Sequence, residues 1–404
     1  MGAAPSAADA ELARLRNEMS ELRRIVDQQK QTIDRLSERL DGVPGGDGSP
    51  SASSPDTSGT RGPLTLSGEG GVAFFSGQND SRFSHQAFRV DEFRLFLESP
   101  VFKDTYIFAE VNLAERERTA NNLYLGEAYL DFENLSKFWG VDRLVNARIG
   151  RIDIPFGEEY SKRDSVDNPL LTHSIMDFWG VDEGIEIYGG LGRANYVLAV
   201  QNGGHPAFED GNGDKAVTGR VGYQLTDHVQ LSLSAMRTGE ISVKGDGMAE
   251  LWLGNDWVRP LPGASPTQFH TDLAELDIQA KLGRTKLKAY GGLGRYEDDG
   301  SAAGRCRNFQ FASIEGVVNI TEAWYGATRV GVFYAPEGFP LPGPSFNSKT
   351  MTWRLWQASV GMGYRVWKNA TAKMEYAFIG GRELDGRQRD HEDLLGLGFS
   401  FRLP

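Results

Sequence analysis

The sequence has almost no cysteine and no long hydrophobic run, and each absence excludes a class of protein. Cys306 is the only cysteine among the 404 residues, so neither an intramolecular disulfide nor a cysteine zinc cluster can form. No stretch of about 18 apolar residues is present, which excludes membrane-spanning helices. Basic residues are outnumbered, with 43 Lys and Arg against 55 Asp and Glu, which argues against a general nucleic-acid binder.

Catalytic and metal-binding motifs are also missing. The sequence contains no nucleophile elbow, no Walker loop and no dinucleotide fingerprint. The segment from Asp210 to Asp214 offers oxygens at the first, third and fifth positions of a calcium loop, but Lys215 replaces the expected glycine and the final glutamate is missing. The six histidines of the chain are scattered without metal spacing: His85, His173, His205, His228, His270 and His391. We predict no enzyme, no cofactor and no metal site, and an Asp- and Gly-rich external loop at 210–214.

Glycine and aromatic residues are abundant. The chain has 49 Gly, 22 Phe, 13 Tyr and 8 Trp. Many short strands joined by tight turns use these residue types, because aromatic side chains suit a pleated sheet and glycine suits the turns. The composition predicts an all-β protein.

A heptad repeat runs from Leu12 to Leu40 without a change of phase. Its a positions are Leu12, Met19, Val26, Ile33 and Leu40, and its d positions are Leu15, Leu22, Gln29 and Leu36. Glu11 and Glu18 precede Arg16 and Arg23 by five residues, the offset of interchain ion pairs in parallel coiled coils. We predict a self-associating coiled coil at 12–40; a helix packed on its own domain is the alternative. The seam does not choose between a dimer and a trimer.

The segments on either side of this repeat predict no fold. Residues 1–11 are expected to be a disordered N-terminus, and Met1 is interpreted as a new start codon before a mature N-terminus. Residues 41–63 are rich in Gly, Ser and Pro and have no hydrophobic period, which is typical of a flexible linker.

From residue 64 onwards, apolar and polar residues alternate in segments of strand length. Between Leu273 and Leu282, for example, every second residue is apolar and the others are charged or polar. We count about sixteen such segments, an even number typical of closed outer-membrane barrels. They lie near 64–76, 87–98, 102–113, 123–133, 143–154, 182–190, 193–202, 216–226, 228–237, 270–283, 284–296, 306–317, 321–335, 352–366, 368–380 and 391–403.

The connections between these segments alternate in length. Short ones lie at 191–192, 226–227, 283–284 and 368–369, and long ones at 155–181, 203–215, 238–269, 336–351 and 381–390. Membrane barrels place short turns at the periplasmic rim and long loops at the exterior, whereas soluble sandwiches and propellers, the alternative, show no strict alternation. The sequence therefore predicts a transmembrane antiparallel barrel at 64–404, preceded by a helical coiled coil.

Three runs in the first half of the barrel carry a family resemblance. They are Phe93-Arg94-Leu95-Phe96-Leu97-Glu98-Ser99-Pro100-Val101-Phe102-Lys103-Asp104-Thr105-Tyr106, then Gly126-Glu127-Ala128-Tyr129-Leu130-Asp131-Phe132, and then Gly150-Arg151-Ile152-Asp153-Ile154-Pro155-Phe156-Gly157. Together they resemble the phosphate-selective porins O and P. The resemblance implies a trimer of sixteen-stranded outer-membrane barrels, each with its own pore and with a constriction loop after the fifth strand. It also favours three strands for the coiled coil.

The expected function follows from this resemblance. It is passive diffusion of small hydrophilic solutes and ions, with a preference for anions or phosphate as the family implies, through a homotrimer in contact with outer-membrane lipid and lipopolysaccharide. The coiled coil would lie in the periplasm and clamp the subunits together or reach towards peptidoglycan. The alternatives are a channel specific for phosphate, carboxylates or sugars, and a plugged structural barrel that tethers the outer membrane through its coiled coil.

Charged residues in the expected loop and lumen are the candidate site. The constriction loop at 155–181 offers Glu158, Glu159, Lys162, Arg163, Asp164, Asp167, His173 and Asp177. Alternation places Arg94, Glu110, Glu127, Asp131, Arg148, Glu186, Arg220, Lys286, Lys288, Arg329, Lys373 and Glu375 in the lumen, beside Glu275 and Asp277. Opposed charges in a narrow passage would sort ions. The alternatives are a solvated external loop and a wall whose charges merely pair. The inward charges are mixed, unlike the Arg and Lys ladders of phosphate-specific members.

Overall fold

The computed structural model describes most of the chain from residue 64 to residue 403. The described residues are 64–81, 83, 85–115, 123–157, 164–175, 178, 180–203, 213–239, 241–242, 252–253, 256–257, 268–297, 306–339 and 352–403. The chain divides into two compact units, 1–49 and 50–404, and only the second contains described residues. The predicted N-terminus, coiled coil and linker lie outside them and stay predictions. No described helix is both long enough and apolar enough to cross a membrane.

The described part consists almost entirely of strands. The long strands are β1 (Thr65–Gly77), β2 (Ala87–Phe102), β3 (Thr105–Glu115), β4 (Tyr124–Phe132), β5 (Asn146–Asp153), β6 (Val181–Leu191), β7 (Ala194–Gln201), β8 (Ala216–Thr226), β9 (Val229–Arg237), β14 (Thr271–Leu282), β15 (Thr285–Glu297), β16 (Cys306–Asn319), β17 (Trp324–Phe339), β18 (Thr352–Trp367), β19 (Ala370–Glu383) and β21 (Leu394–Leu403). The short elements are β10 (Ile241–Ser242), β11 (Trp252–Leu253), β12 (Asp256–Trp257), β13 (Gln268–Phe269), β20 (Gln388–Arg389) and the 3-10 helix η1 (Leu135–Trp139).

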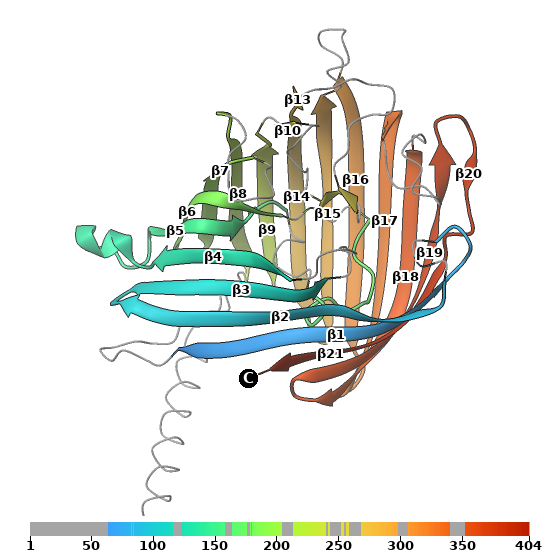
Figure 1. Ribbon diagram of the computed structural model, residues 1–404, viewed down its shortest axis with the longest axis horizontal. Helices are drawn as coiled ribbons and strands as arrows, with labels where there is room; N and C mark the ends of the chain where they lie inside the picture. The colour runs from blue at the N-terminus through green and yellow to red at the C-terminus, as the bar shows by residue number, and fades with distance from the viewer. Residues whose placement is uncertain are drawn as a thin grey trace, which may run out of the picture. The chain divides into compact units, whose positions relative to one another are not determined.

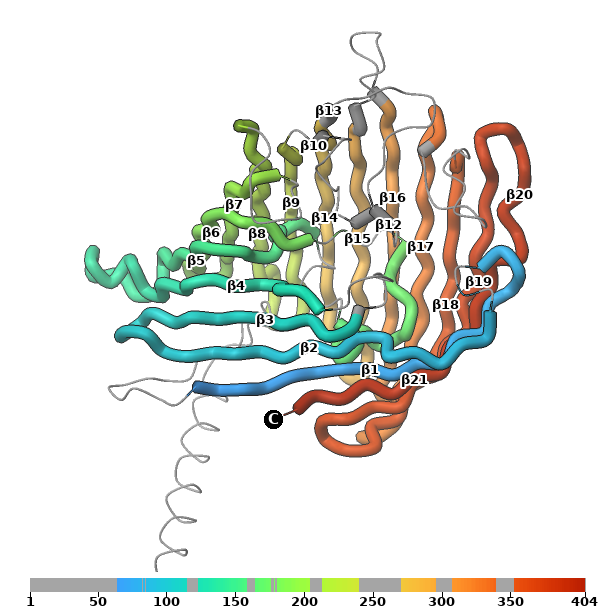
Figure 2. The backbone as a smooth tube through the Cα atoms, viewed as in Figure 1, coloured from blue at the N-terminus to red at the C-terminus, as the bar shows by residue number. Residues whose placement is uncertain are grey.

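The long strands form one closed antiparallel sheet (Figures 1 and 2). Successive long strands pair with each other, and β1 pairs with β21 from Gly68 opposite Leu403 to Gly77 opposite Leu394, which closes the ring. The sheet has 17 strands, and without the two-residue β20 it is a barrel of 16 strands. The predicted all-β fold and strand number are confirmed.

The predicted connections are confirmed in their alternation but not in every detail. Tight turns join β2 to β3, β6 to β7 and β14 to β15, where Asp104, Gly192 and Gly283 have the positive φ that such turns need. Two expectations were wrong at the other rim. β17 and β19 run on into stretches predicted as loops, and the predicted loop 238–269 contains the paired strands β10 with β13 and β11 with β12.

The connection from β4 to β5 is longer than the other described turns at its rim because it contains η1. Ser136 in this helix accepts hydrogen bonds from the backbone N–H groups of Leu144 (2.8 Å) and Val145 (3.0 Å), which fold the connection back on itself. Phe138 and Trp139 are exposed on it.

The barrel buries polar side chains and exposes apolar ones, the reverse of a soluble protein. On β14, Leu276 and Ile278 are 59% and 41% exposed, whereas Glu275 and Asp277 are only 3% and 1% exposed. The same alternation recurs along the other long strands. An apolar outer wall around a polar interior is the arrangement that a lipid environment requires of a barrel.

Placing a charge on this outer wall is expected to destabilise the barrel in lipid. Leu276 lies in the middle of β14 opposite Leu233 of β9, and both are exposed. The L276R variant should lower the free energy of unfolding in lipid vesicles by about 2–4 kcal/mol, the cost of an arginine at the bilayer midplane. Urea titration followed by tryptophan fluorescence measures it. D227R, in the exposed turn between β8 and β9, is the control; equal stability of both variants would contradict a lipid-facing wall.

Candidate functional site

The segment between β5 and β6 turns into the barrel (Figure 1, green). The backbone N–H of Ile154 donates to the carbonyl of Gly180 at 2.7 Å, which brings the two ends of the segment together. Its described apolar side chains include Phe156, Leu170 and Phe178, each no more than 3% exposed. A loop extending into solvent would leave these side chains wet. The alternative of a solvated external loop is therefore wrong for the described part of this segment.

Apolar contacts hold the segment against the inner face of the sheet. The ring of Phe178 lies 5.4 Å from that of Phe156 and 5.3 Å from that of Phe311 on β16. Leu171 packs in a buried cluster with Ala73, Phe75, Ala377 and Leu394 from three strands. Alternation predicts polar side chains at these inward positions. Apolar side chains are found there instead, because the segment covers them.

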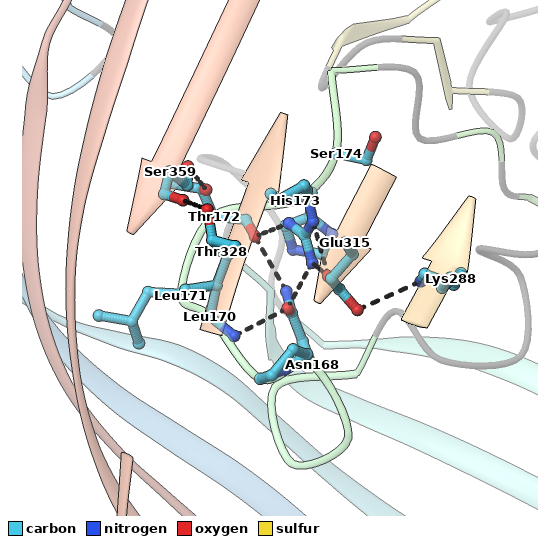
Figure 3. A network of polar contacts seen from close by, with 12 residues as sticks. Asn168, Leu170, Leu171, Thr172, His173, Ser174, Lys288, Glu315, Thr328 and Ser359 are labelled. Carbon is cyan, nitrogen blue, oxygen red and sulfur yellow. Dashed lines mark hydrogen bonds and ion pairs between the residues drawn. The ribbon is translucent and has the colours of Figure 1, made fainter. Parts of the chain in front are cut away.

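Glu375 on β19 is the main polar anchor of the segment. Figure 3 shows the neighbouring network, which includes Asn168, Thr172 and Glu315. One of its carboxylate oxygens accepts hydrogen bonds from the backbone N–H groups of Leu171 (2.6 Å) and Thr172 (2.7 Å). Its other oxygen accepts from the Thr172 hydroxyl at 2.5 Å, and Gln357 on β18 donates to the same hydroxyl at 2.9 Å. A single carboxylate thus satisfies three donors at the centre of the segment.

Arg329 on β17 binds the other side of the same turn. Its guanidinium donates to the Thr172 carbonyl (2.7 Å) and to the Asn168 side-chain oxygen (2.8 Å), while its Nε donates to Glu315 at 2.8 Å. Lys288 lies 3.8 Å from the other oxygen of Glu315. The arginine is 3% exposed, so its whole charge is used inside this network.

A lysine and an arginine also bind backbone carbonyls of the segment. Lys373 on β19 donates to the carbonyls of Ser165 and Asn168, both at 2.5 Å. Arg220 on β8 donates to the carbonyl of Gly157 and pairs with Asp277 at 3.2 Å. Gly157 has a φ of +73°, and a Cβ there would lie 2.9 Å from a Glu275 oxygen, so the turn requires glycine.

Arg94 on β2 lies at the centre of a carboxylate cluster. It pairs with Glu69 (2.7 Å), Glu92 (2.8 Å), Glu110 (3.7 Å) and Asp164 of the loop. The carboxylates of Glu69, Glu92 and Asp164 are close enough together to hold a metal ion. Since the guanidinium contacts each of them, the cluster is built around an arginine.

On the wall formed by β4, β5 and β6, a second arginine has a different setting. Arg148 donates to Asp131 (2.9 Å) and Glu186 (3.2 Å), and its guanidinium carbon lies over the rings of Tyr129 (5.1 Å) and Tyr188 (4.6 Å). The Tyr188 hydroxyl also donates to Asp131 at 2.8 Å. Two carboxylates and two aromatic faces therefore surround one positive charge.

The structure places most of the predicted site residues and leaves some outside its described part. Of the predicted loop residues, Asp164, Asp167 and His173 are described inside the barrel; Glu158, Glu159, Lys162, Arg163 and Asp177 lie outside the described residues, as do residues 210–212 of the rejected calcium loop. Lys286 is exposed near the end of β15. The other predicted lumenal residues lie on the inner face, and most of their charges are paired. The prediction missed Glu69, Asn168, Thr172, Glu315 and Gln357; alternation could have found Glu69, Glu315 and Gln357, which lie on strands.

Comparison with known proteins defines the class of barrel. No protein-family model matches the chain, and no curated protein matches its sequence. Among solved structures it is similar to the outer membrane channel DcaP of Acinetobacter baumannii, with a TM-score of 0.57 at 14% identity over 84% of this chain and 97% of that one. OmpT of Vibrio cholerae gives 0.55 at 10% over 84% and 97%, and an anion-selective porin from Comamonas acidovorans gives 0.54 at 11% over 84% and 99%.

These similarities establish a sixteen-stranded barrel with the fold of outer-membrane porins. At such identities they establish the fold alone. None of them singles out the phosphate-selective porins, so that part of the resemblance stays a proposal.

Proposed function

We propose that this chain is a porin of the bacterial outer membrane, through which small hydrophilic solutes and ions diffuse passively. The observation that carries the proposal is the combination of an apolar outer wall, a polar lumen and a segment folded into that lumen. A sixteen-stranded barrel is wide enough for a water-filled channel. The proposal involves no cofactor and no catalytic step.

The contacts of residues 164–175 leave part of the lumen wall uncovered, and this supports an open passage. Hydrogen bonds and ion pairs between described residues join 164–175 to β2, β15, β17, β18, β19 and β21. The polar side chains of β4, β5 and β6 instead bond to one another. The channel would run between these two surfaces, with the segment as its constriction.

The oligomer and the partners belong to the same proposal. We propose a homotrimer clamped by a periplasmic coiled coil at 12–40, with outer-membrane lipid and lipopolysaccharide against the apolar wall and peptidoglycan within reach. One OmpT structure is described as a trimer form, which supports three subunits by analogy of fold.

A second function, a plugged barrel that tethers the outer membrane, is favoured by one observation. The segment fills part of the lumen with buried side chains, including Phe156, Leu170 and Phe178. A lumen filled across its whole width would make the barrel structural.

Single-channel recording separates the two functions. Purified full-length protein in a planar lipid bilayer should give stepwise conductance that closes in three equal steps for a trimer. Heat-denatured protein is the control for adventitious pores. Heat-modifiable electrophoretic mobility reports whether the protein is folded. Folded protein that shows no conductance would overturn the porin function and support the tethering function.

A further inference from the structure

The basic side chains of the lumen are used to hold the inserted segment. Arg220, Arg329 and Lys373 donate to the loop carbonyls of Gly157, Thr172 and Asn168, respectively, and are 8%, 3% and 5% exposed. Because their N–H groups are donated to the segment, these three side chains are not available to bind an anion in the passage. These residues therefore do not form the exposed ladder of arginine and lysine that the family resemblance implies for phosphate selectivity.

The lumenal face of β3, β4 and β6 is acidic. On β3, β4 and β6, alternation places Glu110, Glu127, Asp131, Asp182 and Glu186 on the lumenal face. Within the described parts of β3 to β7 the only basic side chains are Arg148 and Arg151, and Arg151, which is 4% exposed, pairs with Glu183 at 2.8 Å. We call Glu127, Asp131 and Glu186 the acidic wall.

Arg148 does not neutralise the acidic wall. Asp131 and Glu186 both contact Arg148, so two carboxylates share one positive charge. Glu127 accepts a hydrogen bond from the backbone N–H of Asp153 at 3.2 Å, a neutral partner.

A surplus of one charge sign along a narrow channel with low-dielectric walls concentrates the opposite ion inside it. We propose that this channel passes cations in preference to anions, and that the acidic wall sets the preference. The inference rests on the proposed porin function and opposes the anion or phosphate preference that the family resemblance implies.

Reversal potential under a potassium chloride gradient tests the proposal. The wild-type channel at pH 8 should be more permeable to K⁺ than to Cl⁻. The E127Q/E186Q double variant should reduce the permeability ratio about twofold or more, because it removes two lumenal charges while preserving side-chain size. D227N, in the exposed turn between β8 and β9, removes a charge outside the passage and should leave the ratio unchanged.

Each outcome of this experiment has one meaning. A wild-type channel that prefers Cl⁻, or block of its current by added inorganic phosphate, would overturn the inference but leave the porin function intact. A cation preference that E127Q/E186Q does not alter would overturn the assignment to the acidic wall. Absence of any conductance from folded protein would overturn the porin itself. Conductance of the double variant also reports that its barrel is folded.

Discussion

Replacing Glu375 with alanine is expected to release the segment 164–175 from the wall and to raise single-channel conductance. The substitution leaves the backbone N–H groups of Leu171 and Thr172 and the Thr172 hydroxyl without their carboxylate acceptor. Hydrogen bonds to a charged group contribute about 1.5–3 kcal/mol each, so the loss exceeds what one apolar contact supplies. The segment should then sample positions away from β19, which widens the passage and makes the open current noisy.

Conductance and current noise of E375A in planar bilayers measure this effect, at the same salt as the wild type. E375Q is the matched variant, because its amide oxygen still accepts from the backbone N–H groups and it should show a smaller increase. E322A, at the turn between β16 and β17, controls for loss of a carboxylate elsewhere. Conductance and noise of E375A equal to the wild type would show that Glu375 does not hold the constriction.

Removing Arg94 is expected to destabilise the barrel more than any other single change in the lumen. Its guanidinium pairs with Glu69, Glu92, Glu110 and Asp164. R94M would leave these carboxylates close together without their shared cation, and loss of one partner from a buried ion pair costs about 3–5 kcal/mol. R94K should recover only part of the stability, because a lysine cannot bind several carboxylates with a planar fork.

Urea titration of folded protein in vesicles measures the stability of R94M, with heat-modifiable mobility as the readout of folding. If R94M does not fold at all, R94M/E69Q provides the test, because removing one carboxylate from the cluster should restore part of the folded yield. Wild-type stability of R94M, or no rescue by E69Q, would contradict the role of Arg94 as the centre of the cluster.

The strands could be predicted from the sequence because each one has a lipid face and a lumenal face. This two-sided environment imposes the same period on all of them, as Leu276 and Asp277 on β14 show. The period fails at Phe309, Phe311 and Phe333, which are buried inside the barrel. Alternation assumes that every inward position meets water, and here the inserted segment replaces the water.

Of the site, only the charged residues on the strands could be predicted from the sequence. Arg94, Arg329 and Lys373 lie on the inner face as alternation predicts, because strand geometry alone decides where they point. Their partners Asn168 and Thr172 belong to an irregular segment whose path depends on many weak contacts at once. No local pattern encodes such a path. The sequence therefore indicated where the basic groups lie, but not that they form hydrogen bonds with the inserted segment.

The inserted segment also spans the place where the first and last strands of the barrel meet. Asp167 pairs with Arg402 of β21 at 3.0 Å, and Leu171 packs beside Phe75 of β1 and Leu394 of β21. Cβ atoms at Gly396 and Gly398 would lie 2.8 Å and 2.4 Å from Leu171, so the closing strand leaves room for it. The segment therefore supports the junction of β1 and β21 from inside the barrel, and we expect ring closure and loop insertion to be coupled during assembly. A barrel that closed with the segment between β5 and β6 still outside would lack these contacts at the junction of β1 and β21. Incompletely assembled protein should therefore open first between these two strands.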